Sequence, residues 1–149
     1  MLTKDEIKAK ALEIGFADAG VTGPEPFTSQ LDYIDVDDRY KWTEKLGINL
    51  KTGVNPHNIL ENSKSLIVLL FSYYNNPIPV SLEKHYGRCY LNDDRVTKDG
   101  LAVMVKEFRG FLRDNGINTK IGAGMPDKLS AMRAGIGTAG KNTLLYASK

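Results

Sequence analysis

Cysteine and histidine are scarce in this sequence. Cys89 is the single cysteine among 149 residues, and the two histidines, His57 and His85, lie far apart. One cysteine excludes an internal disulfide and fits a reducing compartment, so we expect a cytoplasmic protein in which Cys89 is a half-buried small residue rather than a reactive thiol. The same scarcity leaves no cluster with the spacing of metal ligands, and we predict no metal site within the chain.

Long apolar runs and a charge of one sign are missing too. No apolar stretch approaches the length that crosses a bilayer, and the first residues, MLTKDEIKAKALEIG, are amphipathic rather than signal-like, so we expect no membrane segment. The net charge of +2 is too small to indicate nucleic-acid binding by itself. A hydrophobic content of 42% is typical of a soluble globular protein, and no repeat or linker interrupts the chain. The sequence therefore predicts one domain, residues 1–149.

Periodicity and turn residues predict an α+β fold with a mixed sheet and flanking helices. Thr3 and Glu6 form a capping-box pattern before a run of apolar residues at helical spacing, and Gly15 is a natural helix end. Residues 66–71 are continuously apolar, which is typical of a central strand buried on both faces. The other expected elements are a strand in 16–22, one or two helices in 27–42, a polar loop between Gly47 and Gly53, a long helix ending at Asn115 and Gly116, a strand in 117–121 and a helix in 127–134. Tyr73 and Tyr74 could line a pocket or cap the core.

Residues 126–146, PDKLSAMRAGIGTAGKNTLLY, carry most of the candidate chemistry. They join a helix-like segment, closely spaced glycines, basic residues and an apolar strand-like end. Such glycines indicate a backbone that turns sharply or lets a ligand approach closely, and the basic residues would suit an anionic ligand. The candidate binding residues are Arg133, Gly135, Gly137, Gly140, Lys141 and Asn142.

Two phosphate-binding motifs match part of this stretch but fail on context. Residues 135–140 fit GxGxxG, yet a dinucleotide site needs a strand before the glycines and a helix after them, whereas here a helix is expected before them. Residues 135–141 fit most of a P-loop, but Asn142 stands where a magnesium-binding Ser or Thr is required. A nucleotide binder is therefore only a third alternative, which loss of ATP affinity in Lys141→Ala would support.

The segment RAGIGTAGKNTLL resembles the signature of epoxyqueuosine reductases and their relatives, iron–sulfur proteins that bind cobalamin and are akin to reductive dehalogenases. The form usual in that family is close to RAGLGWIGKNTLL. The segment VNPHNILENSKSLIVLLFSYYNN and the helix–Gly–Phe–strand start are similar to the same family. The segment HYGRCYLNDD matches more loosely: Arg88 and Tyr90 fit, but the Asp-Tyr-His of relatives does not follow.

The resemblance implies a fold, a cofactor and partners. In the family this domain is an α+β sandwich, similar to cobalamin-processing and flavin-reductase-like folds, that holds one face of a corrinoid. By resemblance, the glycines let main-chain amides reach the corrin edge, while Arg133, Lys141 and Asn142 donate to its amide carbonyls or phosphate. The expected partners are a C-terminal ferredoxin-like domain with iron–sulfur clusters, and tRNA or a small-molecule substrate. From the residues alone, a glycine-stabilised helix-to-strand corner with a solvated Arg and Lys is the alternative.

Two departures from the family bear on function. The chain holds no CxxCxxC run, so we expect it to be the N-terminal fragment of a longer protein whose next domain carries the clusters. Relatives carry an aspartate, the proposed general acid, about twelve residues before the arginine that matches Arg133. That position falls on Ile121, beside Gly122, Ala123 and Gly124, and we interpret Asp127 as a helix N-terminal charge. The catalytic residue is thus unknown, and we expect a reductase with another substrate or, alternatively, a non-catalytic binding module of the same fold.

Overall fold

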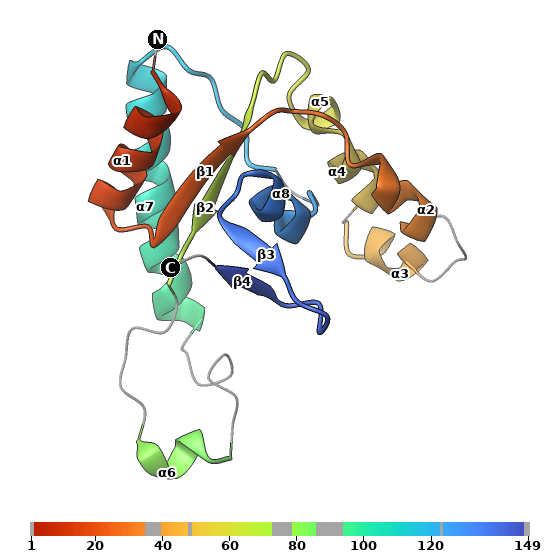
Figure 1. The fold of residues 1–149 in the computed structure, drawn as a ribbon, viewed down its shortest axis with the longest axis vertical. Helices are drawn as coiled ribbons and strands as arrows, with labels where there is room; N and C mark the ends of the chain where they lie inside the picture. The colour runs from red at the N-terminus through yellow and green to blue at the C-terminus, as the bar shows by residue number, and fades with distance from the viewer. Residues whose placement is uncertain are drawn as a thin grey trace. The chain divides into compact units, whose positions relative to one another are not determined.

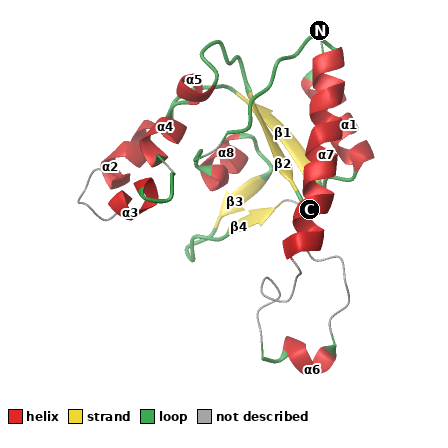
Figure 2. Ribbon diagram, turned by 180° about the vertical axis from the view of Figure 1, so that it is seen from behind, coloured by secondary structure: helices red, strands yellow, loops and turns green. Residues whose placement is uncertain are grey.

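The computed structural model describes residues 2–34, 40–47, 49–72, 79–85, 94–122 and 124–147. Its elements are α1 (Lys4–Ile14), β1 (Asp18–Thr22), the 3-10 helix η1 (Thr28–Gln30), α2 (Leu31–Ile34), α3 (Lys41–Glu44), α4 (Leu50–Val54), α5 (Pro56–Ile59), β2 (Leu66–Leu70), α6 (Val80–Glu83), α7 (Asp94–Asp114), α8 (Asp127–Arg133), β3 (Gly137–Ala139) and β4 (Leu145–Ala147). Helices are mixed with two small sheets, β1 with β2 and β3 with β4 (Figures 1 and 2), so the α+β class is confirmed.

The chain divides into two compact units, which we describe separately. One consists of Met1–Asp18 and Leu69–Ile117, and the other of Ala19–Val68 and Asn118–Lys149. The expectation of a single domain stays a prediction. Cys89, Tyr73, Tyr74, Arg88 and Tyr90 lie outside the described residues. Among the described residues, no helix combines the length and apolar character needed to cross a bilayer.

In the first unit, α1 begins and ends as the sequence predicts. The Thr3 hydroxyl accepts the Glu6 amide at 3.2 Å, and the Glu6 carboxylate accepts the Thr3 amide at 2.7 Å, which completes the capping box. Gly15 ends the helix with a φ of 113°. The buried Asp18 carboxylate pairs with Lys8 at 2.8 Å and so ties the start of β1 to α1.

Helix α7 supplies the core of this unit and lies beside α1 in Figures 1 and 2. Phe108 and Leu112, one turn apart, are 2% and 1% exposed. The Phe108 ring meets Phe16 edge-on, with centroids 6.1 Å apart. The helix ends as predicted at Gly116, whose φ is 76°, and the Ile117 amide donates back to the Leu112 carbonyl at 2.9 Å.

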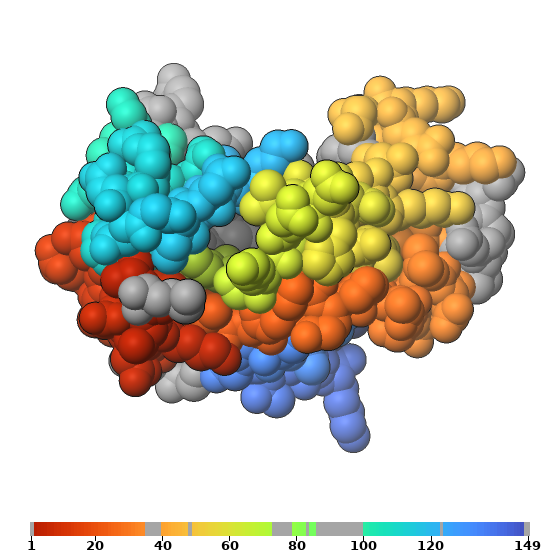
Figure 3. Space-filling model, turned by 90° about the horizontal axis from the view of Figure 1, so that it is seen from above, coloured from red at the N-terminus to blue at the C-terminus, as the bar shows by residue number. Residues whose placement is uncertain are grey.

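In the second unit, the short helices α2, α4 and α5 pack together. Figure 3 shows the orange atoms of the segment around α2 next to the yellow atoms of α4 and α5. Asn49 begins α4 by accepting the Thr52 amide, and Gly53 lies inside that helix, so the polar loop predicted between Gly47 and Gly53 is wrong. A Cβ on Gly53 would lie 1.9 Å from the Gly124 carbonyl oxygen, which shows how closely the two backbones approach.

Two strand predictions differ from the structure. Residues 117–121 form no strand. Strand β2 exists, but all five of its residues are only partly buried, so the prediction of burial on both faces is wrong. The Ala17 amide donates to the Leu70 carbonyl at 2.8 Å, which places the residue before β1 beside the last residue of β2, as in an antiparallel pair. A continuous apolar run identifies a strand without telling how many layers cover it.

Candidate functional site

The first candidate glycine, Gly135, ends helix α8. Its φ is 73°, its amide donates to the Met132 carbonyl at 3.0 Å, and the next amide, of Ile136, donates to the Ala131 carbonyl at 3.1 Å. These two bonds, with Ile136 and Ala131 both buried, form a Schellman motif, which requires a residue that tolerates a positive φ. Gly135 therefore has the same structural role as Gly116 at the end of α7.

Gly137 and Gly140 lie in a β-hairpin. Strands β3 and β4 pair antiparallel, with Gly137 opposite Ala147 and Ala139 opposite Leu145. A Cβ on Gly137 would lie 2.8 Å from the Leu145 Cγ, and one on Gly140 would lie 2.4 Å from the Tyr146 ring. Both glycines thus make room for side chains of β4.

Asn142 and Thr143 close the hairpin. The Asn142 side chain accepts the Leu144 amide at 3.2 Å and donates to the Tyr146 hydroxyl at 3.1 Å. Thr143 has a φ of 63°, which is rare for a β-branched residue, and its carbonyl accepts the Lys128 ammonium at 2.6 Å. The side-chain amide of Asn142 therefore makes its hydrogen bonds within the hairpin. A helix precedes the glycines and a strand follows them, so the structure confirms the context that argues against both phosphate-binding motifs.

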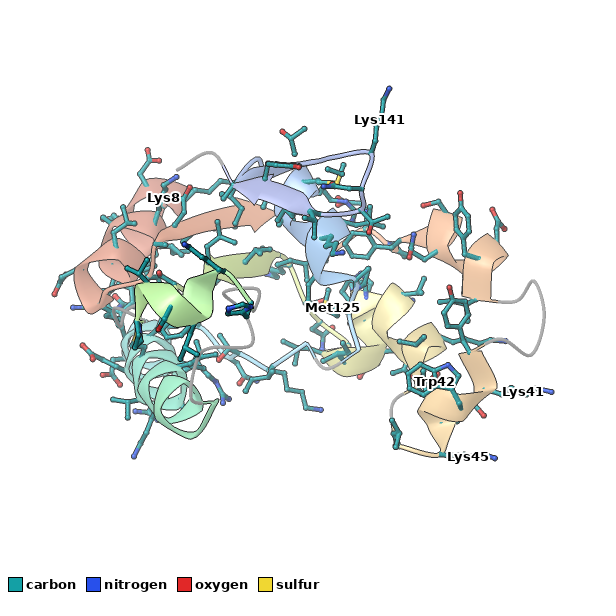
Figure 4. The ribbon with its side chains drawn as sticks, turned by 90° about the horizontal axis from the view of Figure 1, so that it is seen from below. Lys8, Lys41, Trp42, Lys45, Met125 and Lys141 are labelled. Carbon is teal, nitrogen blue, oxygen red and sulfur yellow. The ribbon has the colours of Figure 1, made fainter. Side chains whose placement is uncertain are left out.

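Arg133 and Lys141 differ in their surroundings. The Arg133 guanidinium lies 3.7 Å from the centroid of the Phe27 ring and donates to the Glu25 carbonyl. Lys141 lies at the exposed tip of the hairpin, and Figure 4 shows its side chain extending away from the neighbouring elements. The six predicted residues therefore occupy one continuous corner that runs from α8 to β4. Of the six, Arg133 and Lys141 expose a charged side chain at its surface, and Gly135 exposes its backbone.

Strand β1 packs against this corner through Gly20. A Cβ on Gly20 would lie 2.8 Å from the Ala134 carbonyl oxygen and 2.8 Å from the Ile136 side chain. The contact brings β1 directly against the turn between α8 and β3. Sequence reasoning missed Gly20, Glu25 and Phe27, because their contacts with the corner join segments more than a hundred residues apart, such as the 108 residues that separate Glu25 from Arg133.

The segment before α8 holds the position where the family resemblance expects an acid. Ile121 there is 64% exposed, and Met125 covers Gly122. Asp127 lies in the first turn of α8, as predicted, and partial burial raises the pKa of its carboxyl. Among the described residues, no three His, Cys, Asp or Glu side chains lie close enough together to hold a metal ion.

Comparison with known proteins gives a distant similarity over nearly the whole chain. The chain is 25% identical to an epoxyqueuosine reductase from Leadbetterella byssophila over 158 aligned positions, which cover 97% of this chain and 50% of that protein. It is also 36% identical over 81 residues to a tryptophan synthase alpha chain from Syntrophomonas wolfei, covering 54% of this chain and 31% of that protein. No family model and no solved structure matches. The chain thus spans half or less of the curated relatives that it matches.

Proposed function

We propose that this chain is the cofactor-binding part of a cobalamin- and iron–sulfur-dependent oxidoreductase distantly related to epoxyqueuosine reductase. The observation that carries the proposal is the alignment with such a reductase over 97% of the chain. The signature-like segment RAGIGTAGKNTLL adds support, because its residues fold into a single corner. We further propose that the fold is of the cobalamin-processing or flavin-reductase-like sandwich type.

The corner from α8 to β4 is only partly open to a large ring that is edged with amides. Arg133 and Lys141 offer N–H donors, and no atom lies within 4 Å of the Cβ position of Gly135, which leaves its backbone open to a ligand. Gly137, Gly140 and Asn142 would act through the shape of the hairpin, since their neighbouring space is filled by the chain itself. Bound cobalamin would supply the reducing centre, and these residues would bind and orient it.

The proposed partners follow from the same relationship. Electrons would come from iron–sulfur clusters on a C-terminal ferredoxin-like domain, and the substrate would be a tRNA base or a small molecule. Ile121, at the position of the expected acid, cannot donate a proton. The missing acid favours a substrate other than epoxyqueuosine, or a non-catalytic binding module of the same fold.

Reading the source gene beyond Lys149 and measuring iron and sulfide in the complete product would separate these two functions. Two downstream CxxCxxCxxxCP runs, with about eight iron atoms per chain, would support the reductase. A complete product without bound iron and sulfide would refute it and leave the binding module.

A further inference from the structure

The guanidinium of Arg133 is fixed in position by two neutral groups. Its Cζ lies 3.7 Å from the centroid of the Phe27 ring, and Phe27 is only 2% exposed. The Phe27 amide donates to the Val54 carbonyl at 2.8 Å, which anchors the backbone that carries the ring. The bond from Arg133 to the Glu25 carbonyl fixes the rotation of the guanidinium within its plane. This cation is therefore ordered before any ligand arrives.

Within the described part of the chain, these contacts leave the charge of Arg133 without an anionic partner. A guanidinium has five N–H donors in a planar fork, and one of them is engaged here. The described ion pairs are Lys8–Asp18, Lys10–Glu13 and Arg113–Asp114. The Glu25 carboxylate is turned elsewhere, since both of its oxygens would lie 2.3 Å from a Cβ on Gly23.

The end of α8 does not repel an anion as an open helix terminus would. Carbonyl oxygens at a helix C-terminus carry partial negative charge. Here the carbonyls of Ser130, Ala131 and Met132 accept amides of Ala134, Ile136 and Gly135 at 2.9 to 3.1 Å. Arg133 itself is exposed, and so is Gly135 two residues later, which has no atom within 4 Å of its Cβ position. A ligand can therefore approach the outer edge of the guanidinium.

We propose that Arg133 is an oxyanion-binding residue that takes a phosphate or carboxylate group of a ligand through its guanidinium fork. A planar fork on an aromatic platform matches the two oxygens of such a group, which a lysine cannot do. The phosphate could belong to the nucleotide loop of cobalamin, in which case this inference rests on the proposed function, or to a nucleic-acid backbone. The oxyanion chemistry is common to both.

The direct test is a titration of the isotope-labelled chain with inorganic phosphate, observed by NMR at the Arg133 side-chain Nε–Hε signal in proteins that keep this arginine and at the Gly135 backbone amide in every variant. We expect saturable shifts with a dissociation constant of about 1 mM, which is modest because one side chain carries the contact. Arg133→Lys keeps the charge but loses the fork, and should bind phosphate about tenfold more weakly. Glu25→Gln removes a neighbouring negative charge and should strengthen binding about twofold.

Arg113 provides the matched control, because it is an exposed arginine that has Asp114 within 3.6 Å and belongs to the other unit. Arg113→Lys should leave phosphate binding at the Arg133 signal unchanged. Equal binding by wild type and Arg133→Lys would overturn the proposal. The proposal would also be overturned if the Arg133 signal showed no saturable shift at phosphate concentrations tens of times the expected dissociation constant.

A second series identifies the source of the oxyanion. Hydroxocobalamin should shift the Arg133 signal, whereas cobinamide, which lacks the nucleotide phosphate, should not. A shift with a short single-stranded oligonucleotide instead would assign the site to nucleic acid. Phosphate binding without any response to cobalamin would keep the oxyanion site and refute the cofactor assignment, so the two proposals fail separately.

Discussion

The close approach of α4 to the segment before α8 makes Gly53→Ala a severe change. The new Cβ would lie 1.9 Å from the Gly124 carbonyl oxygen, 2.2 Å from its carbonyl carbon and 2.7 Å from the Met125 amide nitrogen. Contacts below 3.0 Å are essentially never made by Cβ atoms, so the two backbones must separate by about 1.1 Å, the difference between 3.0 and 1.9 Å. Overpacking of this kind typically costs 1 to 3 kcal/mol, and backbone atoms yield less readily than side chains.

Helix propensity works in the opposite direction. Replacing glycine by alanine inside a helix gains roughly 1 kcal/mol. Because backbone atoms meet backbone atoms, we take the upper end of the overpacking range, about 3 kcal/mol, and after subtracting the gain of about 1 kcal/mol we expect Gly53→Ala to lower the free energy of unfolding by a net of about 2 kcal/mol. Gly110→Ala in α7 is the matched control, because the nearest atom to its Cβ, on the flexible Arg113 side chain, is 3.8 Å away. That variant should gain about 0.5 to 1 kcal/mol.

Urea unfolding followed by far-UV circular dichroism measures both variants. Fluorescence of Trp42, the single tryptophan, reports on the unit that contains Gly53. Trp42 lies on α3 between Lys41 and Lys45 (Figure 4) and is 59% exposed, so its signal should change modestly and in step with the dichroism. A Gly53→Ala protein as stable as Gly110→Ala would show that α4 and the Gly124 backbone are not in contact, and the reasoning would be refuted.

Three further changes test other parts of the structure. Leu112→Ala should lower the free energy of unfolding by about 3 kcal/mol in urea denaturation, because this leucine is 1% exposed; a loss below about 1 kcal/mol would contradict its place in the core. The hydrogen bond from the Thr3 amide lowers the pKa of Glu6, so the contribution of this carboxylate to the free energy of unfolding is present above its ordinary pKa of 4.5 and is lost as the pH falls below it. Glu6→Gln should flatten that part of the stability-versus-pH curve, and an unchanged curve would refute the bond. Asn142→Ala should cost about 1 kcal/mol and speed hydrogen exchange at the Leu144 amide, whereas unchanged exchange would contradict the hairpin geometry.

Local signals in the sequence predict the helix ends well. The capping box of Thr3 and Glu6 and the stop at Gly15 depend on residues within one turn of each other, and all three occur in the structure. The local hydrogen bonds of a helix end also explain why the strand predicted at residues 117–121 is wrong. The alternation in residues 117–121 is typical of a strand, but the Ile117 amide already donates to Leu112 and completes the end of α7.

The roles of the candidate glycines could not be predicted from spacing. A cluster of glycines indicates that something approaches the backbone, but not what approaches. At Gly137 and Gly140 the chain's own Leu145 and Tyr146 fill the space, and at Gly135 a helix end requires the positive φ. That cobalamin contacts this corner stays a prediction.

The partners of Arg133 illustrate a second limit. Its position in the sequence motif suggested a ligand contact, whereas the structure adds Phe27 and Glu25 from a distant segment. No local pattern connects residues so far apart, because the contact depends on how the chain folds between them. The structure therefore adds Phe27 and Glu25, beside Gly20, to the candidate site, and both contact the guanidinium of Arg133.

Cobalamin binding by the complete gene product tests the central claim most directly. Hydroxocobalamin is added in steps to the purified protein and to Arg133→Ala, and the visible absorption bands of the corrin are recorded after removal of free ligand. We expect wild type to retain about one equivalent of corrin per chain with shifted bands, and Arg133→Ala to retain less. A complete gene product that retains no corrin after removal of the free ligand would contradict it.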